Sequence, residues 1–275
     1  MTTLEVVTSG ALTTVQDRGR LGLAHLGVPR AGPLDRPAAE LANRLVGNGP
    51  DAALLEVTLG GFAARVTAGT WVAVTGAGRP HARAQWLAAG EHLEVGTPAT
   101  GVRSYVAVAG GIAVAPVLGS RATDTLAWVG PPRVADGAEL PLGPATGEPR
   151  PLDTPRPPRR GPLRLHPGPH ASYFAEGALA AVCVAPYAVR PESNRVGLRL
   201  QGDVVPRRGS AELPSEGMVL GSVQVPPDGQ PVVLLADHPP TGGYPVLGVV
   251  HPGDLWQCAQ LRPGETVGFA PVRGA

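Results

Sequence analysis

The chain has 275 residues, a formal net charge of +1, and no lysine among its basic residues. A net charge this close to zero gives no strong field for nucleic acid or an anionic membrane surface. The absence of lysine excludes a Schiff-base lysine and a P-loop lysine on a phosphate, so arginine must do any clamping of phosphate or carboxylate groups. The two cysteines, Cys183 and Cys258, argue against a disulfide framework or a cysteine zinc site.

The N-terminal sequence MTTLEVVTSG lacks a basic stretch followed by an apolar one, which a secretory signal would need. No apolar run approaches the length of a membrane span. The seven histidines are dispersed, and none stands at paired metal spacing. We therefore expect a cytoplasmic protein with no metal site that binds neither membrane nor nucleic acid.

Glycine and proline, at 38 and 32 residues, divide short apolar runs throughout the chain. This pattern predicts a mainly β fold with many short strands. Several runs are apolar throughout rather than alternating, which predicts strands that are buried on both faces. In chain order, the expected strands are residues 4–7, 12–15, 54–59, 71–75, 105–109, 197–200, 218–225, 232–236 and 246–250.

One helix is predicted after residue 35. Asp35 can cap its N-terminus, Pro37 suits its first turn, and Gly47 can end it. Apolar residues follow at helical spacing between these signals, namely Ala38, Leu41, Ala42 and Leu45. Weaker helical patterns cover residues 254–261 and 172–182.

The segment GEPRPLDTPRPPRRGP at residues 147–162 is rich in proline and arginine and has little to bury. Such a composition is typical of an extended linker. We therefore predict an N-terminal β-rich domain at 1–148, a linker at 149–162 and a C-terminal β domain at 163–275.

Two glycine-rich loops of the first half carry polar side chains. Asp17 and Arg20 follow the predicted strand 12–15, and Ser120, Arg121 and Asp124 follow Gly119. Glycines let backbone N–H groups approach an anion or a carbonyl oxygen closely. Each loop therefore suits ligand binding, and each equally suits a turn with local hydrogen bonds or an ion pair.

The second half has two further polar clusters. Arg195 can clamp a carboxylate or pair with Glu192 at the surface. The other cluster surrounds the predicted strand 232–236, and Asp228-Gly229 before it is a hairpin turn signal. Polar residues at strand ends beside glycines commonly form a site on a β scaffold. Those of this cluster are Gln224, Pro226, Asp237, His238, Thr241, Gly242, Gly243 and Tyr244. A histidine such as His238 can act as a general base near neutral pH, or can simply be hydrogen-bonded.

Several long motifs, in this order, resemble one family. They are TTVQDRGRLGLAHLGVPRAGPLD, AELANRLVGN, LLEVTLGG, YVAVAGGI, LGSRATD, SNRVGLRLQG, LPSEGMVLGSVQVPPDGQPVVLLADHPPTGGYP and AQLRPGE. The chain is similar along nearly its whole length to the C subunit of 5-oxoprolinase, a family also called allophanate hydrolase subunit 2 or KipA-like. The resemblance implies two β subdomains, of which the second is a cyclophilin-like barrel.

The resemblance also implies a function and partners. It points to the C subunit of an ATP-dependent 5-oxoprolinase, which opens 5-oxo-L-proline to L-glutamate with a KipI-like B subunit and an A subunit, and we expect this chain to be inactive alone. ATP would act at the level of the complex. One alternative is the carboxyltransferase component of a biotin-dependent urea carboxylase, and another is a non-catalytic antagonist of a kinase inhibitor.

The substrates of these relatives share a planar amide or ureido group. A site for such a group needs donors for its carbonyl oxygen and acceptors for its N–H. We expect loops of both halves to supply them. The residues to which we give catalytic roles are Asp237, His238, Arg121 and Arg195, and those that we expect to contact the substrate are Gln224, Pro226, Thr241, Gly242, Gly243, Tyr244, Ser120, Asp124, Asp17 and Arg20.

The loop before GGYP departs from the family pattern. Relatives read more like a basic residue and two threonines, whereas this chain has Asp237-His238-Pro239-Pro240-Thr241. The extra proline stiffens the loop and replaces a hydroxyl. This change puts in doubt either the substrate preference or a catalytic role for the loop.

Overall fold

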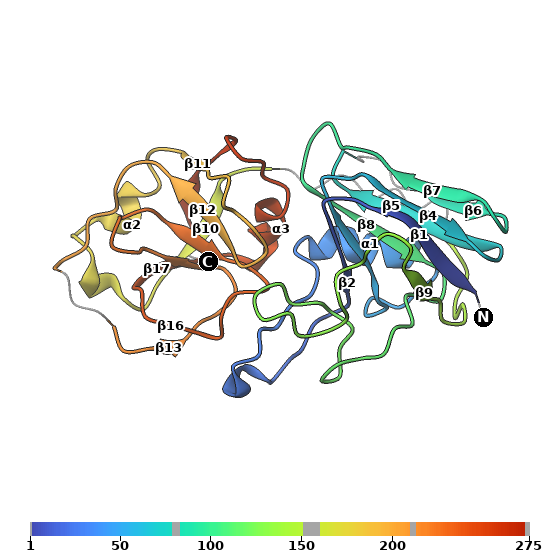
Figure 1. Ribbon diagram of the computed structural model, residues 1–275. Helices are drawn as coiled ribbons and strands as arrows, with labels where there is room; N and C mark the ends of the chain where they lie inside the picture. Colours follow the sequence, from blue (N-terminus) through green and yellow to red (C-terminus); the bar gives the residue numbers. More distant parts are fainter. Residues whose placement is uncertain (1, 79–82, 151–159, 210–212, 273–275) are drawn as a thin grey trace. The chain divides into compact units, whose positions relative to one another are not determined.

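The structure is a computed structural model that describes residues 2–78, 83–150, 160–209 and 213–272. The chain forms two compact units, one of residues 1–21 and 31–158 and one of residues 22–30 and 159–275 (Figure 1). Residues 22–30 group with the second unit, although they precede most of the first in sequence. The linker that we predict at 149–162 remains a prediction, because residues 151–159 lie outside the described part.

Two antiparallel sheets make up the first unit. One has four strands in the order β7-β4-β1-β9, and the other has five in the order β2-β3-β8-β5-β6 (Figure 1). Their bounds are β1 Thr3–Ser9, β2 Leu12–Gln16, β3 Leu54–Thr58, β4 Phe62–Val66, β5 Thr70–Gly76, β6 Ala84–Leu87, β7 His92–Val95, β8 Arg103–Val108 and β9 Glu139–Pro141.

The five-stranded sheet is buried on both faces. One face packs on the four-stranded sheet through a core that includes Leu55 of β3 and Val66 of β4. The other face packs on helix α1 (Arg36–Leu45), where Leu45 of the helix meets Leu54 and Ala107 of the sheet. Both faces of β3 and β8 are therefore buried, as their largely apolar sequences predict.

Helix α1 begins and ends where its sequence predicts. The Asp35 carboxylate accepts a hydrogen bond from the Ala38 N–H at 3.0 Å, and proline occupies the first turn. Gly47 follows the helix with φ of +79°, a conformation that glycine adopts without strain.

A buried polar network holds the segment before α1. The hydroxyl of Tyr105 donates to the Glu56 carboxylate at 2.9 Å and accepts from the Asp35 N–H at 2.7 Å. Arg103 lies 3.3 Å from the same carboxylate. Burial, and then the charges of Glu56 and Asp35, raise the pKa of Tyr105 well above its ordinary value. The hydroxyl therefore keeps its proton, and the network serves as a structural support.

The second unit is built on an eight-stranded sheet in the order β18-β11-β12-β15-β14-β17-β10-β19 (Figure 1). Its two edge strands, β18 (Thr266–Val267) and β19 (Phe269–Pro271), are separated in sequence by Gly268 alone. The sheet therefore curves back on itself into a nearly closed barrel. The other strands are β10 Leu163–Pro167, β11 Tyr187–Val189, β12 Gly197–Gln201, β14 Ser222–Gln224, β15 Val232–Leu234 and β17 Val246–Val250.

This architecture confirms a mainly β fold with a barrel of cyclophilin-like type in its second part. The Asp228-Gly229 turn is also confirmed: Gly229 has φ of +72° and its N–H donates to the Pro226 carbonyl at 2.9 Å. The predicted strand 218–225 is shorter than expected. Gly221, with φ of +88°, interrupts it, and only Ser222–Gln224 pairs as β14.

The helices of the second unit are shorter than predicted. Instead of a helix at 172–182, the chain forms η2 (Ala171–Tyr173) and α2 (Ala178–Ala181). Instead of one at 254–261, it forms η3 (Pro252–Asp254) and α3 (Leu255–Cys258). A further short helix, η1 (Ala24–Leu26), lies in the segment 22–30. Among the described residues, no helix is long and apolar enough to cross a membrane.

A two-stranded ribbon completes the second unit. It pairs β13 (Glu216–Gly217) with β16 (Thr241–Gly242) in antiparallel register. The Met218 N–H continues this pairing with a bond of 2.8 Å to the Pro240 carbonyl. The ribbon therefore carries part of the polar cluster that the sequence singles out.

Candidate functional site

The predicted site residues fall into two groups, one in each unit. The first unit holds Asp17, Arg20, Ser120, Arg121 and Asp124, and the second holds Arg195, Gln224, Pro226, Asp237, His238, Thr241, Gly242, Gly243 and Tyr244. Each group is described within its own unit.

In the first unit, Asp17 ties two loops together. Its carboxylate accepts hydrogen bonds from the Ser120 hydroxyl, from the Arg121 N–H at 2.6 Å and from the Gly19 N–H at 2.9 Å. The loops at 17–20 and 117–124 are therefore brought together. Asp17 and Ser120 are engaged in these hydrogen bonds, so both side chains support the loops.

Two other charged residues of this unit bind backbone. Arg20 is 3% exposed and donates to the carbonyls of Val117 at 3.1 Å and Ala122 at 2.6 Å. Asp124 is 0% exposed and accepts from the N–H groups two and three residues later. Both side chains thus fix the shape of the loop.

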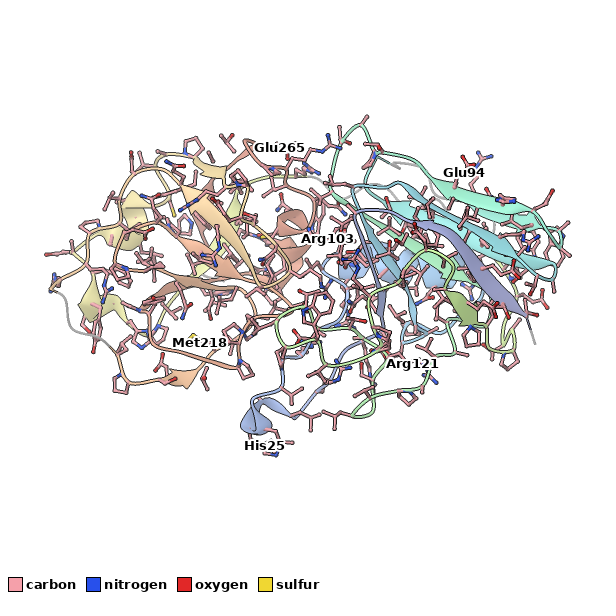
Figure 2. The ribbon with its side chains drawn as sticks, in the orientation of Figure 1. His25, Glu94, Arg103, Arg121, Met218 and Glu265 are labelled. Carbon is pink, nitrogen blue, oxygen red and sulfur yellow. The ribbon has the colours of Figure 1, made fainter. Side chains whose placement is uncertain are left out.

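Arg121 differs from its neighbours because its guanidinium is only partly used. Its Nε donates to the Val114 carbonyl at 2.6 Å, and its two terminal nitrogens have no partner in the described part of the chain (Figure 2). The side chain is half-buried and held at its base. It can therefore present two donors to a carboxylate or a carbonyl oxygen.

In the second unit, Arg195 and Asp237 form a buried ion pair. Nε and a terminal nitrogen of Arg195 donate to the two carboxylate oxygens of Asp237 at 2.8 and 2.9 Å. Their side chains are 2% and 0% exposed. Arg195 therefore pairs with Asp237, not with Glu192, whose carboxylate accepts from Arg190 at 3.2 Å. The buried pair fixes the end of β15 and the start of the loop that follows.

His238 stands directly after this ion pair. Its Nδ1 lies 2.7 Å from the Pro239 carbonyl, and since a carbonyl only accepts, Nδ1 carries the proton. Burial lowers the pKa of His238 below its ordinary value of 6.5, against the smaller opposing effects of Pro239 and Asp237. Nε2 is then an unprotonated nitrogen, and it has no protein partner among the residues that the structure describes. This is the state that a general base requires.

Gln224 lies beneath the ribbon. Its Nε2 is 3.2 Å from the Met218 sulfur and 3.4 Å from the Tyr244 carbonyl. A Cβ on Gly242 would lie 2.8 Å from the same nitrogen, so only glycine fits there without a shift. Gln224, Gly242 and Tyr244 are thus brought together, and the Tyr244 side chain is 47% exposed.

The remaining predicted residues surround this group. Thr241 is exposed on β16, and Gly243 packs near the Leu213 carbonyl. The Pro226 carbonyl accepts the Gly229 N–H inside the hairpin turn. Among Thr241, Gly243 and Pro226, Pro226 has a clear structural role, because its carbonyl closes the hairpin turn.

Two residues that sequence reasoning missed lie in the same unit. Nε2 of His170 is 3.0 Å from the Glu216 carboxylate, and Nδ1 of His170 accepts the Val246 N–H at 3.0 Å. The two residues are far apart in sequence, and neither belongs to a glycine-rich cluster. The pairing of β13 with β16 brings Glu216 to this place, and no local sequence signal predicts that pairing.

No group of three or more His, Cys, Asp or Glu side chains within the described ranges is arranged to hold a metal ion. The chemistry available in the second unit is instead that of a neutral imidazole, an amide and a carboxylate. These groups can bind and deprotonate a polar, uncharged ligand.

The carboxyltransferase domain family, subdomains A and B, matches residues 26–271. The chain is 38% identical to the C subunit of 5-oxoprolinase from Escherichia coli (strain K12), over 97% of this chain and 90% of that protein. It is 39% identical to the solved structure of TTHA0988, with a TM-score of 0.88, over 98% of this chain and 55% of that one. It is also similar to the solved urea carboxylase of Kluyveromyces lactis, with a TM-score of 0.89 and 29% identity, over 98% of this chain and 27% of that one.

The chain thus spans about half the length of TTHA0988 and nearly all of the E. coli protein. The family match and the similarity to the E. coli protein both cover most of its residues. The chain therefore belongs to the carboxyltransferase-domain family that includes the C subunit of 5-oxoprolinase.

Proposed function

We propose that this chain is the C subunit of an ATP-dependent 5-oxoprolinase, which hydrolyses 5-oxo-L-proline to L-glutamate. The observation that carries this proposal is the match along 97% of this chain and 90% of the E. coli protein of that name. A reaction that depends on ATP would take place in the cytoplasm.

The second unit supplies groups that suit this reaction. Opening a lactam breaks its C–N bond, adds the oxygen of water to the carbonyl carbon and leaves a proton on the nitrogen. His238, with its free Nε2, can take a proton from the attacking water. Gln224 of the same unit can hydrogen-bond the amide plane. Described by itself, the first unit offers Arg121, whose terminal nitrogens suit a carboxylate.

This chain does not hold ATP in a Walker-type loop, because it has no lysine. We therefore assign the binding of ATP to the assembled complex, in which a KipI-like B subunit and an A subunit join this one. This assignment makes the isolated chain inactive.

Exposed apolar side chains support a role in assembly. They lie on the loops of residues 117–128 in the first unit, where Leu118 and Trp128 are 53% and 52% exposed. Both residues have positive φ, +50° and +57°, which is uncommon for side chains other than glycine. Strained backbone that presents apolar groups to solvent is typical of a functional surface.

A second candidate is the carboxyltransferase part of a urea carboxylase that uses carboxybiotin. The TM-score of 0.89 with K. lactis urea carboxylase favours it. A ureido group has the same planar N–C=O arrangement as a lactam, so one site chemistry would serve both. Biotin would be attached outside this stretch of sequence, which lacks the lysine that it needs.

Co-expression of this chain with its B and A subunits tests the proposal. We expect glutamate release from 5-oxoproline that requires both ATP and this chain. Release that is equal without this chain, or without ATP, would contradict the assignment. Carboxylation of urea in the presence of a biotin carboxylase and its carrier, with no release of glutamate, would favour the second candidate.

A further inference from the structure

The His170–Glu216 pair is held in one defined arrangement. His170 is 8% exposed and its ring packs edge-on against Tyr173, with centroids 5.8 Å apart. Because Nδ1 accepts the Val246 N–H, the proton of the neutral ring must be on Nε2, which donates it to Glu216 at 3.0 Å. The imidazole thus fixes one oxygen of the carboxylate.

The register of the ribbon shows which way Glu216 faces. Glu216 lies directly opposite Gly242, and residues opposite each other in an antiparallel pair share a face. The missing side chain of Gly242 would point at Nε2 of Gln224, 2.8 Å away. Met218, two residues after Glu216 and so on the same face, accepts a hydrogen bond from that nitrogen. Glu216 and Gln224 therefore lie on the same side of the ribbon.

Two acceptor atoms on this side are available. The Glu216 side chain is 41% exposed, and only one of its carboxylate oxygens contacts His170. The other oxygen, and the amide oxygen of Gln224, have no hydrogen-bond partner within the described ranges. Asp237, which the sequence suggests as an acceptor, is fully buried against Arg195.

We propose that Glu216 binds the N–H of the planar amide substrate, with Gln224 beside it, and that His170 is the residue that positions Glu216. This inference rests on the proposed function and extends it by naming the group that accepts a hydrogen bond from the substrate N–H. A carboxylate accepts a hydrogen bond from an N–H strongly, whereas a tertiary amide, such as an N-methylated lactam, has no N–H and would leave the acceptor unsatisfied. The site would therefore select primary and secondary amides, which have an N–H, and reject tertiary amides, which have none.

The test measures binding of 5-oxoproline and of N-methyl-5-oxoproline to the assembled complex, with urea and tetramethylurea as a second pair. We expect the wild type to prefer the N–H ligand of at least one pair by about tenfold or more. Glu216→Gln should reduce this preference to less than about threefold, while the thermal midpoint of unfolding stays unchanged. The matched control is Glu192→Gln, which changes an exposed carboxylate of the same unit that is paired with Arg190, and it should retain the preference.

A second pair of variants tests the positioning role. His170→Ala should lose the preference, and His170→Gln should recover part of it, because the Gln amide can still donate to Glu216. Equal affinity of the wild type for both members of each pair, no binding of any of them, or an unchanged preference in Glu216→Gln would overturn the inference. If the complex keeps the preference but releases no glutamate, the proposed function fails and this inference stands. If glutamate is released with the same KM in wild type and Glu216→Gln, the inference alone fails.

Discussion

Arg195 and Asp237, 42 residues apart in sequence, join through two charge-assisted hydrogen bonds at 2.8 and 2.9 Å in a place that water does not reach. The Asp237 N–H also donates to the Arg195 carbonyl at 3.1 Å. The pair thus links β12 to the end of β15 and sets the direction in which His238 leaves the barrel. Its role is to hold the site in place, because neither side chain is exposed to a ligand.

Removal of one partner of this ion pair should destabilise the second unit strongly. Arg195→Ala leaves the Asp237 carboxylate buried without its cation, at a cost of about 3–5 kcal/mol in the free energy of unfolding. Chemical denaturation measures the change. The control is Arg190→Ala, which breaks an exposed pair and should leave stability unchanged. A loss in Arg195→Ala no larger than in this control would contradict the assignment.

His238 should titrate below its ordinary pKa of 6.5, because burial disfavours the imidazolium. The unfolded chain then takes up a proton at a higher pH than the folded chain does. Stability from this residue is therefore fully present above pH 6.5 and is lost as the pH falls from there through the folded pKa. NMR titration of the imidazole measures the folded pKa directly, and His238→Asn should remove this part of the pH dependence. A midpoint at or above 6.5 would show that His238 is solvated.

Gly242→Ala should impair the site without unfolding the unit. The added methyl group would lie 2.8 Å from Nε2 of Gln224 and 3.2 Å from Cγ of Met218, so Gln224 must move. We expect about a tenfold loss in kcat/KM of the assembled complex, since a displaced polar contact typically costs about 1–2 kcal/mol. Gly217→Ala, on the paired strand of the same ribbon, meets nothing within 4 Å and provides the control. Equal activity of the two variants would mean that Gln224 takes no part.

Asp17→Ala should loosen the loop that carries Arg121. It removes the acceptor for the Ser120 hydroxyl and for the Arg121 and Gly19 N–H groups. We expect the free energy of unfolding of the first unit to fall by about 2–3 kcal/mol and hydrogen exchange to accelerate at the Arg121 amide. Asp51→Ala, which breaks an exposed pair with Arg18 at 3.3 Å, should change neither. Unchanged exchange in Asp17→Ala would contradict the role of Asp17 as the tie between the loops.

Sequence patterns predict the local elements well where the signal is itself local. Asp35 and Gly47 mark both ends of α1 through contacts within a few residues, and Asp228-Gly229 marks the turn between β14 and β15. The weaker helices fail because their patterns are short. At residues 172–182, Phe174 is extended and Gly177 has φ of +76°, so only single turns remain.

The candidate site is predicted in its residue types but not in their partners. Arg195 has Glu192 as a charged neighbour in sequence, yet it pairs with Asp237 through the packing of β12 on β15. Glu216 lies within one of the family motifs, but the motif does not mark it as a site residue, because its place depends on the register of a two-residue strand. Such long-range pairings follow from the topology of the whole barrel, which the family resemblance implies and composition alone does not.

The single residue between β18 and β19 has a consequence for any shortened form of the protein. β18 pairs with β11, and β19 pairs with β10. Loss of residues 266–271 would therefore leave backbone N–H and C=O groups of both β11 and β10 unpaired. Two open strand edges invite intermolecular pairing and aggregation. Tags and fusions on this chain are therefore better tolerated beyond residue 271 than as replacements for any part of that short stretch.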